Sequence, residues 1–189
     1  VQRTADRKQD AVYIEVWPPY DRYASIAQLI RDARTYAKDD KSTILAAYLK
    51  PFREGKREKA LPAAKLLMGS IVSNGATHLL TGENQTALTQ GYYSDYTKLS
   101  DSEAEAIRRY YDYMIWYENL FFDPELQDVT MTHTGWDNYE YQCTSHKVSS
   151  YGEAGKIWMI LREKDYRKCI YLLNLCGQSE DYWNEGKEE

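Results

Sequence analysis

A single carboxylate between two large aromatic side chains is the first feature of this sequence that could perform acid–base chemistry. Glu15 stands between Tyr13 and Trp17 in a run that alternates β-branched and aromatic residues and stops at a double proline. That pattern is typical of a β-strand, in which these three side chains share one face. The opposite face carries the aliphatic residues Val12, Ile14 and Val16.

The aromatic neighbours suggest how Glu15 could work. Because apolar surroundings disfavour the charged form of a carboxyl group, Glu15 could hold a proton near neutral pH and act as a general acid. The alternative is that Glu15 only pairs with a Lys or Arg at the end of its strand.

Composition restricts the class of protein. The 189 residues are 43% hydrophobic and 28% charged, which is ordinary for a globular domain with a proper core. A net charge of −5 leaves no basic footprint, so nucleic acid is not an expected partner. No apolar run is long enough to span a membrane, and the polar start of the chain shows no signal peptide. Eighteen Tyr and five Trp against three Phe favour aromatic surfaces with polar edges, which suit sugar rings as well as interfaces.

The first two thirds of the chain alternate strands and helices. Asp21 is the expected N-cap of the first helix, and Ser100 with Glu103 forms a capping box before the third. This alternation predicts βαβ units and a parallel sheet, with a ligand site at the C-terminal ends of the strands. The expected elements are strands at 12–17, 43–49 and 77–81 and helices at 23–37, 62–74 and 100–123.

Polar or aromatic side chains follow all three predicted strands. Glu15 and Trp17 stand at the end of the first strand, Tyr48 stands at the end of the second, and Glu83 and Asn84 follow the third. We expect these side chains to meet at one edge of the sheet.

From about residue 128 the pattern changes to strands separated by turns, at 129–133, 156–161 and 169–175. No helical pattern intervenes, which predicts the start of an all-β unit.

The cysteines and histidines give no metal site. An odd number of Cys without a CxxC pair indicates neither a zinc site nor a clear disulfide framework. The dispersed His residues favour structural or surface roles, and we expect no cofactor. The residues concerned are Cys143, Cys169, Cys176, His78, His133 and His146.

Several segments in one order carry a resemblance to glycoside hydrolase family 66, the family of dextranases and cycloisomaltooligosaccharide glucanotransferases. These segments are 12–20, 44–48, 80–84, 110–113, 132–135, 172–175 and 183–184. The resemblance implies an α/β fold, with residues 1–127 as the last three βα units of a (β/α)8 barrel. Residues 128–189 would then begin a β-sandwich domain.

The resemblance also implies a reaction. Family members cleave α-1,6-glucans such as dextran and isomaltooligosaccharides by a retaining mechanism that uses two carboxylates. Glu15 matches the acid/base, whereas the Asp nucleophile has no counterpart in this chain. Trp17, Tyr48, Glu83 and Asn84 are the expected substrate contacts, although Glu83 could instead pair with Glu15. An extracellular or periplasmic location follows from the same resemblance.

Three functions stay open at this point. The segments between Tyr48 and Leu66 and between Asn84 and Ser100 are too short for an inserted carbohydrate-binding module. This favours an endo-acting dextranase over a glucanotransferase that forms cyclic products. A non-catalytic carbohydrate-binding or structural fragment is the third reading.

Overall fold

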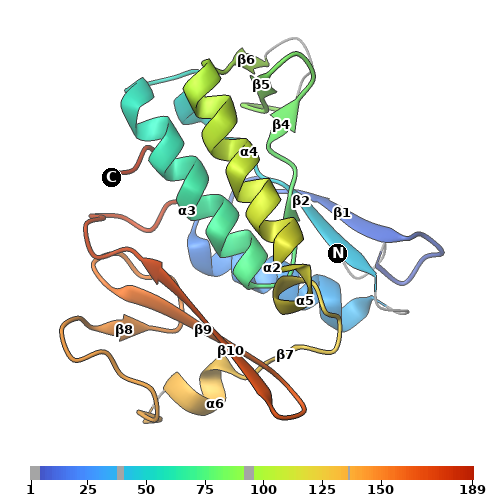
Figure 1. Cartoon of the computed structure of the whole chain (residues 1–189), viewed down its shortest axis with the longest axis vertical. Coiled ribbons are helices and arrows are strands. Elements are labelled where there is room, and N and C mark those ends of the chain that lie inside the picture. The colour runs from blue at the N-terminus through green and yellow to red at the C-terminus, as the bar shows by residue number, and fades with distance from the viewer. Residues whose placement is uncertain (1–4, 38–40, 92–95, 136) are drawn as a thin grey trace.

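The structure, a computed structural model, describes residues 5–37, 41–91, 96–135 and 137–189 (Figure 1). The helices are α2 (Tyr23–Tyr36), η1 (Lys50–Phe52), η2 (Arg57–Lys59), α3 (Ala60–Ser73), α4 (Asp101–Trp116), α5 (Glu118–Phe121) and α6 (Thr130–Thr134). The strands are β1 (Ala11–Glu15), β2 (Ser42–Ala46), β3 (Thr77–His78), β4 (Thr81–Gly82), β5 (Thr86–Ala87), β6 (Thr97–Lys98), β7 (Gln127–Asp128), β8 (Val148–Ser149), β9 (Ile157–Lys164) and β10 (Arg167–Asn174). None of the helices within these ranges has the length and apolar character needed to cross a membrane.

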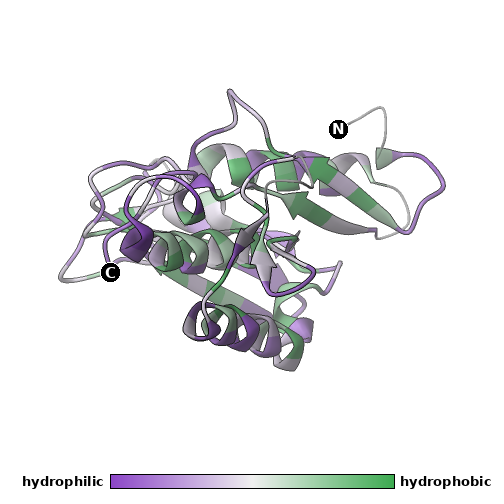
Figure 2. Cartoon of the chain, turned by 90° about the horizontal axis from the view of Figure 1, so that it is seen from above, coloured by the Kyte–Doolittle hydropathy of each residue, from purple (hydrophilic) through white to green (hydrophobic). Residues whose placement is uncertain are grey.

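The first sheet is parallel and has the order β1-β2-β3. Ile14 of β1 lies opposite Leu45, and Ile44 lies opposite Thr77 of β3. The prediction that these three segments pair in parallel is therefore confirmed. Hydrophobic residues colour much of the strands near the N-terminus (Figure 2), but burial alternates along β1, with Val12 buried and Tyr13 and Glu15 exposed, so only one face of this strand is covered.

Helix α3 is the central element of the fold. It packs against α2, β3, α4 and β10, and thus lies between the parallel sheet and the long β9–β10 pair (Figure 1). Ala64, Leu67 and Ile71 are completely buried along its length. The helix ends at Ser73, with Asn74 as its C-cap and Gly75 next at a φ of +91°, so the predicted stop at Asn74-Gly75 is confirmed.

The second half of the chain is only partly as predicted. β9 and β10 form an antiparallel pair where two strands were expected, whereas the predicted strand at 129–133 is wrong because helix α6 occupies it. Asp128 accepts a hydrogen bond from the backbone N–H of Thr130 at 3.0 Å. The Thr130 hydroxyl in turn bonds the backbone of Leu161. These contacts favour a turn over an extended strand.

The prediction of part of a (β/α)8 barrel followed by the start of a β-sandwich is wrong. Within the described ranges the parallel sheet has three short strands and is open, with β1 and β3 at its edges. The third strand pairs over only two residues, after which β4, β5 and β6 form a separate antiparallel sheet. A barrel requires strands that continue the ladder around to closure, and these small sheets do not. The predicted domain boundary at 127/128 stays a prediction.

One predicted cap is also wrong. Arg22, not Asp21, is the N-cap of α2, and its side chain makes no capping hydrogen bond.

Candidate active site

Glu15 ends strand β1 and accepts three hydrogen bonds from aromatic side chains. The hydroxyl groups of Tyr48 and Tyr13 donate to Oε1 at 2.9 and 3.3 Å. The indole Nε1 of Trp17 donates to Oε2 at 3.1 Å. Both carboxylate oxygens are thus held, which fixes the orientation of the group.

The surroundings of Glu15 differ from the expected apolar setting. Glu15, Tyr13 and Trp17 are exposed, and the aromatic residues meet the carboxylate through their polar atoms. Among the described residues Glu15 forms no ion pair with a Lys or Arg. The alternative prediction, that Glu15 only pairs with a Lys or Arg at the end of its strand, is therefore not what the structure shows.

Tyr48 is positioned by the strand next to β1. It follows β2, and its ring lies 5.4 Å from that of Trp17, tilted by 48°. Burial raises the pKa of Tyr48, and its hydrogen bonds with Tyr13 and Glu15 raise it further. The phenol therefore remains a proton donor toward Glu15 throughout the neutral range.

His78 supports this arrangement from inside the protein. Its Nε2 lies 3.0 Å from the carbonyl oxygen of Ala47, the residue before Tyr48. Burial lowers the pKa of His78 to about 4, partly opposed by that hydrogen bond. A neutral imidazole that donates to Ala47 thus helps to fix the backbone at Tyr48.

Glu83 and Asn84 occupy a different setting. They lie in the turn between β4 and β5, where Asn84 has a φ of 56°, a left-handed conformation that Asn tolerates. Both side chains are exposed, and within the described ranges neither bonds Glu15 or its partners. Their role as sugar contacts stays a prediction.

Two further residues at this site were not singled out as functional by sequence reasoning. The first is Tyr13, whose hydroxyl donates to Glu15. The spacing of the two residues predicts that they share one face of the strand, but not that they form this bond. Gly91 lies against Trp17: a Cβ added there would meet Cζ2 and Cη2 of the indole at 3.0 Å. The only signal in the sequence for this contact was the presence of a glycine in the predicted loop between Asn84 and Ser100.

The loop that follows Trp17 is held by the last residues of the chain. Trp183 donates from Nε1 to the carbonyl of Tyr20 at 2.7 Å and from its backbone N–H to the carbonyl of Asp21 at 3.0 Å. Arg22 forms an ion pair with Asp181, and its guanidinium stacks 4.4 Å from the ring centroid of Tyr182.

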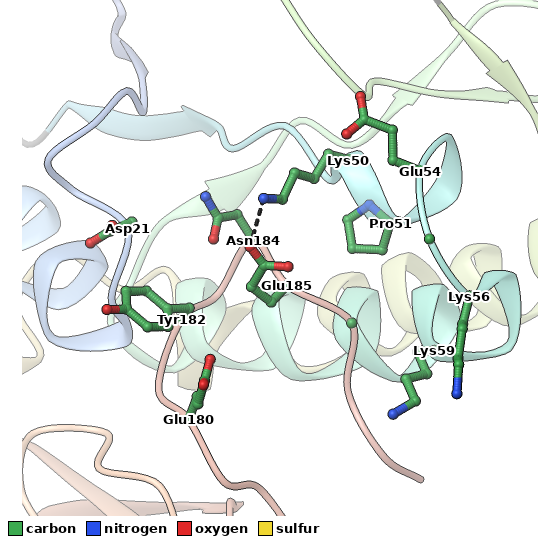
Figure 3. Close-up of a pocket in the computed structure, with 12 residues that line it drawn as sticks. Asp21, Lys50, Pro51, Glu54, Lys56, Lys59, Glu180, Tyr182, Asn184 and Glu185 are labelled. Atoms are coloured by element: carbon green, nitrogen blue, oxygen red, sulfur yellow. Dashed lines mark hydrogen bonds and ion pairs between the residues drawn. The ribbon is translucent and has the colours of Figure 1, made fainter.

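A cavity of about 650 Å³ lies beside this loop (Figure 3). Asp21 and Lys50, which continue the segments of Trp17 and Tyr48, form part of its wall, and Lys50 pairs with Glu185 at 2.6 Å. None of the five predicted site residues lines it. The lining residues are Asp21, Lys50, Pro51, Glu54, Gly55, Lys56, Lys59, Glu180, Tyr182, Asn184, Glu185 and Gly186.

The sequence model of Glycosyl hydrolase family 66 matches residues 1–189, the whole chain. The chain belongs to glycosyl hydrolase family 66. As a member of this family it is a stretch of a glycoside hydrolase-type enzyme.

Relatives of this family 66 chain are much longer than it is. It is 27% identical over 127 residues to a cycloisomaltooligosaccharide glucanotransferase of Niallia circulans, covering 67% of this chain and 13% of the relative. A second enzyme of that description and organism is 24% identical over 125 residues, which are 66% of this chain and 12% of the relative.

A solved structure shares the fold. It is a Paenibacillus sp. cycloisomaltooligosaccharide glucanotransferase complexed with cycloisomaltoheptaose, with a TM-score of 0.79 at 12% identity. The match covers 97% of this chain and 43% of that chain.

Proposed function

We propose that this family 66 chain supplies the acid/base of an enzyme that cleaves α-1,6-glucosidic linkages, and that Glu15 is that residue. The observation that carries the proposal is the fixed Glu15 carboxylate at the C-terminal end of β1, held by Tyr48, Tyr13 and Trp17. Strand ends of parallel sheets are where such groups meet ligands. The family membership and the relative solved with cycloisomaltoheptaose support an α-1,6-glucan as substrate.

The geometry suits a residue that changes role during a retaining reaction. In the first step Glu15 gives a proton to the leaving oxygen, and in the second it takes one from water or an acceptor sugar. A phenol hydroxyl can donate to the ionised carboxylate and turn to accept from the protonated acid. Tyr48 and Tyr13 can therefore follow Glu15 through both states. In this proposal the nucleophile comes from a part of the protein beyond these 189 residues.

The deciding experiment is Glu15→Gln in the full-length protein. Turnover of dextran should fall by about 10²–10⁴-fold, the usual contribution of general acid–base catalysis. An activated aryl glucoside should lose less in its first step, because its leaving group needs less protonation. Glu118→Gln, an exposed carboxylate on α5, is the matched control and should keep full turnover. Wild-type turnover of dextran by Glu15→Gln would refute the assignment.

The products separate two forms of this function. We propose endo-hydrolysis of dextran to linear isomaltooligosaccharides, because residues 50–59 hold only the two short helices η1 and η2 and no inserted module. The names of the relatives favour the second candidate, a glucanotransferase that releases cyclic products. Chromatography of the products on dextran decides between them, since cyclic species as the main product would establish the second. The extracellular or periplasmic location implied by the resemblance belongs to the same proposal.

A further inference from the structure

The absence of a side chain at Gly91 sets how close this segment can come to Trp17. A Cβ there would lie 3.0 Å from Cζ2 and Cη2 of the indole and 3.6 Å from the hydroxyl of Tyr48. Contacts of 3.0 Å are tighter than nearly all that real Cβ atoms make, so a neighbour would have to move. Cζ2 and Cη2 lie on the same side of the indole as Nε1, the atom that donates to Glu15 at 3.1 Å.

Leu88, three residues before Gly91, is held by the backbone of two neighbouring segments, whereas Trp17 is half-exposed. The backbone N–H of Leu88 donates to the carbonyl of Leu80 at 2.8 Å, and the N–H of Leu49 donates to the carbonyl of Leu88 at 3.1 Å. Leu88 is 7% exposed, but Trp17 is 46% exposed. A methyl group at residue 91 would therefore press on this indole, whose N–H donates to Glu15.

We propose that Gly91 is a positioning residue, which acts through Trp17 to hold the carboxylate of Glu15. Trp17 lies against both Gly91 and the ring of Tyr48, and its indole N–H donates to Oε2 of Glu15. Trp17 thus serves the acid/base and not chiefly as a stacking platform for sugar. This inference rests on the proposed role of Glu15.

A double-mutant cycle in the full-length protein tests the proposal. Gly91→Ala and Trp17→Phe should each lower kcat on dextran by about 10–100-fold, the usual value of a hydrogen bond to a charged group, with KM changed less than about twofold. Added to Trp17→Phe, Gly91→Ala should cost less than about twofold, because the bond it breaks is already absent and the smaller ring leaves space. Gly177→Ala is the control, since a Cβ there meets nothing within 4 Å and Gly177 has no positive φ. It should leave kcat and KM unchanged.

Several outcomes would overturn the inference. Multiplicative losses in the double variant would mean that Gly91 does not act through Trp17, and unchanged kcat in Gly91→Ala would remove its role. If Gly91→Ala fails to fold, Trp17→Phe alone still decides: a raised KM with an unchanged kcat would make Trp17 a sugar platform. An active Glu15→Gln enzyme instead refutes the proposed function itself, so the two failures are distinct.

Discussion

Tyr48 contributes the shortest of the three hydrogen bonds to Glu15, at 2.9 Å. Its replacement by Phe keeps the ring that packs against Trp17 but removes the hydroxyl. Tyr48→Phe should lower kcat/KM on dextran by about 10–100-fold, because a donor to a charged group is lost. Tyr166→Phe, at a fully exposed position, is the control and should not change kcat/KM. Equal kinetics for both variants would show that Tyr48 does not assist Glu15.

His78 makes stability depend on pH. Burial lowers its pKa from 6.5 to about 4, so between these values the unfolded chain binds a proton that the folded chain does not. The contribution of the neutral, buried His78 to the free energy of unfolding is therefore complete above pH 6.5 and is lost as the pH falls toward 4. From pH 6.5 to 4.5 the free energy of unfolding should fall by about 2–3 kcal/mol on account of this group. Denaturant titrations of wild type and His78→Leu check this, because the variant should show a smaller decrease over that interval.

At the scale of elements, the start of α4 combines a cap with an ion pair. Ser100 and Glu103 form the capping box, and Arg57 of η2 donates to both carboxylate oxygens of Glu103 at 2.8 and 2.7 Å. Arg57 is the main cause that lowers the pKa of Glu103 to about 2. The ionised Glu103 therefore stabilises the folded protein above pH 4.5, and this contribution is lost as the pH falls toward 2.

Glu103→Gln should lower the free energy of unfolding at pH 7 by about 1–2 kcal/mol, through the weaker cap and the lost ion pair. The difference from wild type should shrink when the melts are repeated near pH 2. Glu105→Gln, on the same helix but paired only with the exposed Arg108 and Arg109, should change stability less at pH 7. A larger loss in Glu105→Gln would contradict this account.

The sequence predicted correctly those features that depend on residues close together in the chain. The capping box at Ser100, the stop at Gly75 and the common face of Tyr13, Glu15 and Trp17 each depend on residues within four positions. Parallel pairing also followed from the alternation of strands and helices. Where distant contacts contribute, the sequence was insufficient: the predicted strand at 129–133 is helix α6, and the hydroxyl of its first residue, Thr130, bonds the backbone of Leu161.

The candidate site was likewise predicted only in part. Glu15, Trp17 and Tyr48 were expected at one sheet edge, and the structure joins them through hydrogen bonds and ring contact. The contact between Gly91 and Trp17 could not be foreseen, because it joins residues that are far apart in the sequence.

At the scale of the molecule, Trp183 joins the end of the chain to the loop after β1. It is 3% exposed, and its N–H groups bond the carbonyls of Tyr20 and Asp21. Trp183→Ala should lower the free energy of unfolding by about 3–5 kcal/mol, the usual cost of removing a buried Trp. Trp116→Ala, 79% exposed on α4, should change it by less than about 0.5 kcal/mol. Denaturant titration of both variants measures the contrast.

The partners in that junction are far apart in the order of synthesis: Arg22 and Asp181 are separated by 159 positions. A growing chain emerges from its N-terminus, so the loop after Glu15 leaves the ribosome long before the residues that hold it. A nascent chain stalled before Asp181 should expose this loop to protease. The loop should become resistant to protease only after Trp183 has emerged. Synthesis through residue 183 would then be needed before the loop that follows Glu15 is held in place.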